Sequence, residues 1–478
     1  MSPAADLPLQ PGGRVHFLGI CGYAVSGAAL IAKELGYAVS GSDEDAYPPV
    51  TERITAAGIP WVNFHSPSNL ALFGEPALVV VGNQVREGNT ELVAARASGI
   101  PCLSEMEFYR QITSDRQRVA VCGTHGKSTT AALLTHILDV AGSDPGFRLG
   151  ATPVDFGTTA RLGSGPFVFE GDEYRTSSWD PRPKFLHIDP EVLVVTNIEY
   201  DHPDIYATRE EYVSAFRTLL SQTTPSATVV MSADDPLSRE LADLVPARLV
   251  SIGEDPAATW KLLGRRDVKE GQSVEIRVPS GVDISVRLPL WGEHNARNAL
   301  CALAAAETLG VQVDRAAMGL EHFHGVRRRF EVLGEACGTF VVDDYAHHPT
   351  KVRATLSAAR ERWPWHRLVA LFVPHTYSRT GALLDEYAAS FGDADTVLVG
   401  PVEAARERKD EESVDSGRLV SALRERGVAA TTVSSPEDAL RKLSAVVGEK
   451  DVILCMTVRG FDDIARRALD MLRGRPDA

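Results

Sequence analysis

The sequence predicts an α/β protein made of three consecutive domains, and two observations support this class. Short apolar runs alternate with stretches of helical spacing along most of the chain, which is typical of parallel sheets covered by helices on both faces. The chain has 478 residues. At roughly 100–200 residues per domain, this length corresponds to about three domains. We place them at residues 1–114, 115–328 and 329–478.

The first domain is predicted to be Rossmann-like. Its strands are expected at residues 14–20, 77–82 and 100–103, and its helices at residues 25–35, 51–57, 89–98 and 105–112. Gly19 and Gly22 follow the first strand as in a dinucleotide-binding turn, although the spacing is loose. Asp43 follows the next strand, where an acidic residue often contacts a ribose or base. Tight packing of a helix on the sheet explains the glycines equally well.

The second domain is predicted to combine a parallel sheet with a small antiparallel appendage. Its strands are expected at residues 118–122, 167–169, 192–196 and 227–231, and its helices at residues 127–141, 296–309 and 315–322. Polar and apolar residues alternate with period two within residues 260–290, which predicts the antiparallel part.

The third domain returns to alternating strands and helices and is again predicted to be Rossmann-like. Its strands are expected at residues 340–343, 368–372, 396–399 and 452–455.

The sequence GTHGKST at 123–129 lies between a predicted strand and a predicted helix. Glycines let the backbone approach oxygens closely, and N–H groups at a helix start favour anions. Lys127 supplies a charge for the β- and γ-phosphates of a nucleotide, and Ser128 or Thr129 is a potential magnesium ligand. Val121 stands where the usual phosphate-loop motif has its first glycine. A tight turn capped by Ser128 and Thr129 is the alternative.

Acidic residues follow two predicted strands of the second domain. FVFEGDEY places Glu170 at one strand end, and VVTNIEYDHPDIY places Glu199, Asp201 and His202 after another. Open α/β sheets bind ligands at the carboxyl ends of their strands. Magnesium prefers a few carboxylate oxygens together with water and phosphate, so Glu170 is a candidate ligand. A solvated acidic loop is the alternative.

Four polar segments in the later half of the chain are candidates for further contacts. Asn295 lies near a helix start and either caps it or contacts a ligand. Arg327 opens a run of three arginines, which either is solvated or clamps a γ-phosphate. Asp343 and His348 (VVDDYAHHPT) follow a strand, where either a binuclear metal site or a ribose or phosphate contact is conceivable. Arg379 (VPHTYSRTG) lies at another strand end, where an anionic substrate could dock.

Composition excludes several classes of function. The chain carries 49 Lys+Arg against 64 Asp+Glu, a formal charge of −15, which gives no general reason to expect a nucleic-acid partner. Its six cysteines form no CxxC pair, so neither a disulfide framework nor a structural zinc site is expected. We also expect no signal peptide and no membrane-spanning helix, and therefore a cytoplasmic protein.

Taken in order, GTHGKST, EGDE, NIEYDH, GEHNARNA, RRRFE and DDYAHHPT resemble the muramate (Mur) ligase family, from about Arg14 to Leu472. The resemblance implies an ATP- and Mg²⁺-dependent ligase of peptidoglycan metabolism with UDP-N-acetylmuramate as one substrate. Its two-step reaction converts the lactyl carboxylate to an acyl phosphate, which an amine then attacks. Positioning and charge neutralisation dominate such chemistry.

The resemblance also implies roles for individual residues, with Lys127, Glu170 and His202 at the catalytic centre. ATP would contact Gly123, Thr124, His125, Gly126, Lys127, Ser128, Thr129, Asn295, Arg327 and Asp343. Ser128 and Glu170 would hold the Mg²⁺ at the β- and γ-phosphates, and His202 a second ion beside the lactyl carboxylate. The UDP-sugar would contact Gly19, Gly22, Asp43 and Asn83, and the incoming amine His348 and Arg379.

The amine substrate is predicted from finer similarities within the family. The segment DEYRTSSWDPRPKF is similar to members that attach the tripeptide L-Ala-γ-D-Glu-meso-diaminopimelate during peptidoglycan recycling. VPHTYSRT is instead similar to members that attach L-alanine, and CMTVRGFDDI departs from the loop typical of recycling members. Folylpolyglutamate- and cyanophycin-type synthetases share the central domain but lack the HFLGICG start domain. A non-catalytic nucleotide-binding scaffold is the alternative of another class.

Overall fold

The structure, a computed structural model, describes residues 12–46, 50–203, 205–404, 407–409 and 413–474. The chain divides into two compact units. The first comprises the described parts of residues 1–198, 215–260 and 301–319, and the second those of residues 199–214, 261–300 and 320–478. Among the described helices, none is both long enough and apolar enough to cross a membrane. All six cysteines are free thiols.

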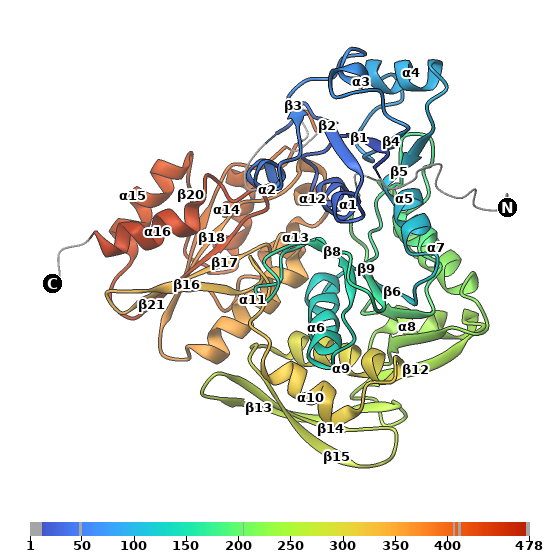
Figure 1. The fold of residues 1–478 in the computed structure, drawn as a ribbon. Coiled ribbons are helices and arrows are strands. Elements are labelled where there is room, and N and C mark those ends of the chain that lie inside the picture. Colours follow the sequence, from blue (N-terminus) through green and yellow to red (C-terminus); the bar gives the residue numbers. More distant parts are fainter. Residues whose placement is uncertain (1–11, 47–49, 204, 405–406, 410–412, 475–478) are drawn as a thin grey trace. The chain divides into compact units, whose positions relative to one another are not determined.

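The first unit begins with a parallel sheet of strand order β3-β2-β1-β4-β5 (Figure 1). Its strands are β1 (Arg14–Leu18), β2 (Ala38–Ser42), β3 (Trp61–Val62), β4 (Leu78–Val81) and β5 (Cys102–Ser104). Its helices are α1 (Tyr23–Glu34), α2 (Val50–Ala56), α3 (Asn69–Leu72), α4 (Thr90–Ala97) and α5 (Glu105–Ile112). The central strands β1 and β4 are almost wholly buried, as their apolar runs predict.

A second sheet in the first unit has the strand order β12-β11-β10-β6-β9-β7-β8. Its strands are β6 (Arg118–Cys122), β7 (Gly146–Arg148), β8 (Ala160–Arg161), β9 (Phe167–Glu170), β10 (Val192–Val195), β11 (Thr228–Ser232) and β12 (Arg248–Gly253). Its helical segments include α6 (Lys127–Val140), η1 (Lys184–His187), α8 (Pro236–Leu241) and η2 (Ala242–Leu244). Strand β6 runs parallel to β10 on one side and β9 on the other, so the segments after these three strands emerge at one edge.

The predicted antiparallel part is confirmed. It consists of β13 (Trp260–Val268), β14 (Gly271–Arg277) and β15 (Asp283–Leu288), each antiparallel to the next. Three helices of the middle part of the chain are α7 (Arg209–Ser221), α9 (Glu293–Thr308) and α10 (Val313–Glu321).

The second unit ends with a sheet of strand order β16-β17-β21-β18-β19-β20, in which only the β16–β17 pair is antiparallel. Its strands are β16 (Glu331–Ala336), β17 (Thr339–Asp344), β18 (Arg367–Phe372), β19 (Thr396–Val399), β20 (Ala430–Thr432) and β21 (Asp451–Met456). Its helices are α11 (Pro349–Arg362), α12 (Tyr377–Ala382), α13 (Leu384–Ala388), α14 (Ser416–Glu425), α15 (Pro436–Val446) and α16 (Ile464–Arg473).

Two apolar cores flank this sheet. Val342 packs in one core with α11, α13 and α14, whereas its neighbour Val341 packs in the other with α15 and α16. Successive strand residues point to opposite faces, so both faces of the sheet are covered. The alternation of strands and helices in the sequence therefore predicted the architecture correctly.

Candidate functional site

The loop between β6 and α6 depends on two glycines. Gly123 has φ +124°, and a Cβ added there would lie 2.2 Å from Oγ1 of Thr196. Gly126 caps α6 with φ +80°. Asn197 holds the loop from the end of β10, because its carbonyl accepts the Thr124 N–H at 3.0 Å and its Oδ1 accepts the His125 N–H at 3.0 Å. The result is a rigid turn that opens the N-terminus of α6 to an anion.

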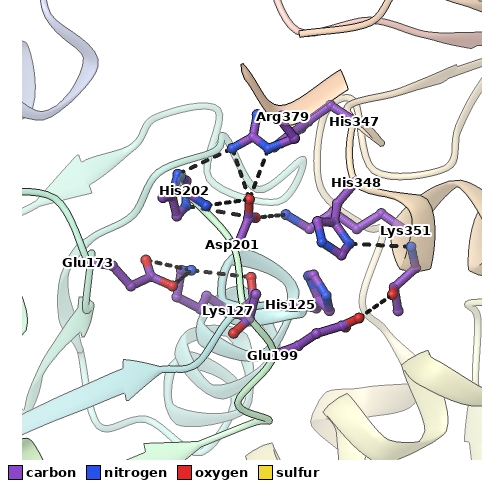
Figure 2. A network of polar contacts seen from close by, with 12 residues as sticks. His125, Lys127, Glu173, Glu199, Asp201, His202, His347, His348, Lys351 and Arg379 are labelled. Carbon is purple, nitrogen blue, oxygen red and sulfur yellow. Dashed lines mark hydrogen bonds and ion pairs between the residues drawn. The ribbon is translucent and has the colours of Figure 1, made fainter. Parts of the chain in front are cut away.

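Lys127, the first residue of α6, is held by a buried carboxylate (Figure 2). Its Nζ donates to Oε1 and Oε2 of Glu173 at 2.7 and 2.9 Å, and to the carbonyl of Gly123 at 2.6 Å. Burial raises the pKa of Glu173 to about 7, against the opposing charge of Lys127. Burial lowers the pKa of Lys127, but Glu173 outweighs it and the net shift is upward. Glu173 therefore keeps the lysine charged and aimed at the loop.

Ser128 and Glu170 lie side by side. The Ser128 hydroxyl donates to Oε1 of Glu170 at 2.8 Å, and the Gly150 N–H donates to Oε2 at 2.7 Å. The strand register brings these two side chains together, because Glu170 ends β9 opposite Val121 of β6. Val121 lies two residues before the loop. A hydroxyl beside a carboxylate offers the oxygen ligands that Mg²⁺ prefers.

In the second unit, Arg379 and Asp201 form a buried ion pair (Figure 2). Nε of Arg379 donates to Oδ1 of Asp201 at 2.9 Å, and Nη2 lies 2.9 Å from the same oxygen. Nη2 also lies 3.3 Å from Nδ1 of His202, and Nζ of Lys351 lies 3.9 Å from the other oxygen of Asp201. Burial raises the pKa of Asp201, but His202, Arg379, Lys351 and His348 together hold it well below its usual range.

His348 caps α11, with its Nδ1 accepting the Thr350 N–H at 3.3 Å. The Thr350 hydroxyl donates to Oε1 of Glu199 at 2.7 Å, so the NIEYDH segment contacts the start of α11. Burial and the charges of Lys351 and Arg379 hold the pKa of the neighbouring His347 well below its usual range, so this imidazole is neutral.

Among the three consecutive arginines, Arg327 and Arg328 have different surroundings. The Arg327 side chain is 58% exposed and pairs with Glu331. Arg328 has φ +59°, which turns its side chain inward, where it donates to the carbonyls of Thr457 and Val458 at 2.6 and 2.8 Å. Its Nε also lies 3.3 Å from Oδ2 of Asp343. Burial raises the pKa of Asp343 to about 6 despite Arg328.

Asn295 lies in the first turn of α9 and is buried. Its Nδ2 donates to the carbonyl of Trp291 at 2.8 Å, and its Oδ1 accepts from Nδ2 of Asn298 at 3.1 Å. The two asparagines of the GEHNARNA motif are thus hydrogen-bonded to each other.

The candidate UDP-sugar residues lie at the carboxyl ends of β1, β2 and β4 in the first unit. Asp43 closes the end of β2: its carboxylate accepts the Cys21 N–H at 2.7 Å, the Glu44 N–H at 2.8 Å and the Asp45 N–H at 3.0 Å. Burial, with added repulsion from Asp43 and Asp45, raises the pKa of the Cys21 thiol to about 12. After β4, Nδ2 of Asn83 donates to the carbonyl of Arg175 at 3.3 Å.

A buried carboxylate beneath this edge fixes the end of β2. Oε1 of Glu91 lies 2.6 Å from Nε2 of His16, and its Oε2 accepts from the Ser42 hydroxyl at 2.9 Å and from Nδ2 of Asn69 at 3.1 Å. Nδ1 of His65 lies 3.4 Å from the same oxygen. Burial raises the pKa of Glu91, but its hydrogen bonds to His16 and His65 lower it to about 2.

Glu91→Gln should therefore change the acid dependence of stability. Because the folded-state pKa of about 2 lies below the ordinary 4.5, ionised Glu91 stabilises the fold above pH 4.5, and this contribution is lost as pH falls toward 2. Between pH 5 and pH 3 the wild type should lose about 2 kcal/mol relative to Glu91→Gln. Urea unfolding at both pH values measures the difference, with exposed Glu87→Gln as control. A constant gap between wild type and Glu91→Gln would contradict the assignment.

Within the first unit the structure brings together the predicted Lys127, Ser128 and Glu170, and within the second His202, His348 and Arg379. Sequence reasoning assigned no role to Glu173, although it is the last acid of the EGDE motif. It also assigned no role to Asp201, which precedes His202.

Protein-family models match most of the chain. The model described as "Mur ligase family, catalytic domain" matches residues 14–117, that described as "Mur ligase middle domain" matches residues 121–306, and that described as "Mur ligase, glutamate ligase domain" matches residues 328–458.

Individual proteins match over nearly the whole chain. A UDP-N-acetylmuramate–L-alanine ligase of Roseiflexus sp. (strain RS-1) is 36% identical, covering 96% of this chain and 99% of that protein. The crystal structure of a UDP-N-acetylmuramate-alanine ligase from Thermotoga maritima superposes with a TM-score of 0.78 at 27% identity, covering 96% and 99% of the two chains. That of a murein peptide ligase from Psychrobacter arcticus superposes with a TM-score of 0.72 at 28% identity, covering 97% and 100%.

Proposed function

Because this chain belongs to the Mur ligase family and is accordingly an ATP-dependent, amide-forming ligase of cell-wall synthesis, we propose that it joins the tripeptide L-Ala-γ-D-Glu-meso-diaminopimelate to UDP-N-acetylmuramate. The observation that carries ATP-driven ligation is the pairing of Lys127 with Glu173 beside the Ser128–Glu170 contact. This arrangement places one cation and two oxygen ligands at the N-terminus of α6.

In the proposed reaction the lactyl carboxylate of the sugar attacks the γ-phosphate of ATP, and ADP leaves. The amine of the peptide then attacks the acyl phosphate, inorganic phosphate leaves, and an amide remains. Lys127 leaves its partner Glu173 and binds the phosphates instead, where it neutralises the charge that builds up on them. The loop N–H groups of residues 123–129 orient the nucleotide.

Ser128 and Glu170 are the proposed ligands of the Mg²⁺ at the phosphates, and His202 is the proposed ligand of a second ion beside the lactyl carboxylate. The hydroxyl and carboxylate fit the ion, since both are hard oxygen donors within hydrogen-bond reach of each other. When bound, Mg²⁺ supplies charge neutralisation for the β- and γ-phosphates. Asn295, Arg327 and Asp343 are proposed as further ATP contacts, and exposed Arg327 can exchange Glu331 for phosphate.

Two lines of support bear on the tripeptide. The murein peptide ligase structure matches 97% of this chain. Within the DEYRTSSWDPRPKF segment, Lys184 is also buried in the first unit and pairs with Glu105. His348 and Arg379 are the proposed amine contacts, with Arg379 changing partner from Asp201 to a substrate carboxylate.

L-alanine is the second candidate amine. The Roseiflexus relative named above is an L-alanine ligase, and the Thermotoga structure has the higher TM-score of the two superpositions. Both candidates present the same L-alanyl amine to the acyl phosphate, so the activation step is common to them.

The other substrate is proposed to bind the first sheet. Gly19, Gly22, Asp43 and Asn83 surround the carboxyl ends of β1, β2 and β4, the edge at which such sheets take nucleotides. We propose residues 1–114 as the UDP-sugar domain, 115–328 as the ATP domain and 329–478 as the amine domain. We also propose a cytoplasmic location, where ATP and the UDP-sugar are available.

The test is phosphate release by the full-length protein with ATP, Mg²⁺ and UDP-N-acetylmuramate, adding either the tripeptide or L-alanine. We expect turnover with the tripeptide and a product whose mass equals the two substrates less one water. Turnover with L-alanine alone would establish the second candidate. If neither amine gives phosphate release, both candidate ligase activities are contradicted, and the alternative of a non-catalytic nucleotide-binding scaffold remains.

A further inference from the structure

Four charged side chains are packed together inside the first unit, behind the phosphate-loop residues Lys127 and Ser128. Glu105, the first residue of α5, is fully buried between Arg148 and Lys184, which are themselves 4% and 3% exposed. Nε and Nη2 of Arg148 lie 2.9 Å from Oε1 of Glu105, and Nζ of Lys184 lies 3.0 Å from Oε2. The charge of Asp172 faces both of these cations and also Lys127, so the group holds two acids and two cations and adjoins the phosphate-loop lysine.

Arg148 also contacts the candidate magnesium ligand. Its Nη1 donates to the main-chain carbonyl of Glu170 at 3.0 Å. Two residues later on the same segment, the Gly150 N–H holds Oε2 of Glu170 at 2.7 Å. A Cβ at Gly150 would lie 2.9 Å from Oε1 of Glu170, so the segment fits closely around this carboxylate. Main chain and side chain of Glu170 are thus both fixed from residues 148–150.

The stability of the fold does not by itself explain why these four charges are buried together. Taking charges out of water is expensive, and replacing a buried ion pair by apolar residues of similar size is often neutral or stabilising. The planar guanidinium, however, can hold a carboxylate and a carbonyl in one fixed geometry, which an apolar residue cannot do. The arrangement therefore imposes orientation on the end of β9.

We propose that Arg148, anchored by Glu105, is a positioning residue that orients Glu170 for binding of the metal–nucleotide complex. Arg148 itself touches neither substrate nor metal in this scheme. The chain of contacts runs from the start of α5 through Arg148 to Glu170 and Ser128. It rests on the proposed role of Glu170 in holding Mg²⁺, and it is independent of which amine is the substrate.

Arg148→Met tests the proposal by calorimetric titration of the full-length protein with ADP and Mn²⁺. Groups that orient a metal ligand typically contribute about 10- to 100-fold to metal affinity, so Mn²⁺·ADP should bind at least about 10-fold more weakly. The KM for UDP-N-acetylmuramate should change less than the affinity for Mn²⁺·ADP. Arg161→Met is the matched control, because Arg161 likewise bonds a carboxylate (Asp139) and a carbonyl (Pro145) without touching Glu170.

A second variant keeps the test decisive if the single change prevents folding. Glu105→Leu/Arg148→Met removes one complete ion pair and leaves Lys184 with Asp172, so no buried charge remains unbalanced. We expect this variant to unfold near the wild-type temperature and to bind Mn²⁺·ADP as weakly as Arg148→Met. Wild-type affinity in either folded variant would overturn the proposal, as would a lower unfolding temperature without weaker binding. Phosphate release by the wild-type protein, measured separately, tests the proposed function.

Discussion

Lys127→Met is expected to lower the rate of ATP-driven ligation at least about 100-fold, because single preorganised charge-stabilising groups contribute about 10²–10³-fold in enzymes. Lys127 is the cation that the structure holds at the phosphate loop, by bonds from Nζ to Glu173 and to the Gly123 carbonyl. Methionine keeps the length of the side chain but not its charge. Steady-state phosphate release at saturating substrates measures the loss.

The same change leaves Glu173 buried without its cation, so folding needs its own control. Lys127→Met/Glu173→Gln removes both charges and should restore the unfolding temperature without restoring turnover. Lys269→Met, at an exposed lysine of the β13–β14 turn, should leave both quantities unchanged. Near-normal turnover of Lys127→Met would rule out the assigned role of the lysine.

Arg379→Leu is expected to destabilise the protein by about 3–5 kcal/mol, the usual consequence of removing one partner of a buried ion pair. Asp201 is fully buried, and Arg379 supplies two close nitrogens to one of its oxygens. Nζ of Lys351 lies 3.9 Å from the other oxygen of Asp201, so Lys351 offsets the lost charge of Arg379 only in part. Urea unfolding of the full-length protein, followed by tryptophan fluorescence, measures the effect.

A double-mutant cycle separates the ion pair from loss of packing. Asp201→Leu/Arg379→Leu should be more stable than Arg379→Leu, because no uncompensated charge remains. Arg277→Leu is the control: Arg277 also forms a double contact with an acid, Asp283, but both side chains are about half exposed, and its removal should change stability little. Equal effects of Arg277→Leu and Arg379→Leu would contradict the account.

The parts of the site that follow from strand ends could be predicted from sequence. The strand–glycine–helix pattern identified Lys127 and Ser128, and the acid at the end of the next strand identified Glu170. The structure places these three residues together because the carboxyl ends of neighbouring parallel strands meet at one edge, so a local pattern fixes a long-range neighbour.

Pairings between distant segments could not be predicted. Asp201 and Arg379 are 178 residues apart in the chain, and no periodicity relates them. The opposite surroundings of Arg327 and Arg328 follow from the φ of +59° at Arg328, which identical side chains do not reveal. Strands β7 and β8 have three and two residues, too short for a period to show. Arg148 was overlooked for this reason.

The setting of Cys21 bears on how the enzyme responds to electrophiles and oxidants. Such reagents attack the thiolate, and at a pKa of about 12 almost none is present at neutral pH. The backbone of Cys21 nevertheless anchors Asp43 at the proposed sugar edge. Among the six thiols only Cys337, in the turn between β16 and β17, is exposed. Alkylation or mild oxidation is therefore expected at Cys337 in the second unit, and covalent inhibitors aimed at Cys21 would find an unreactive target.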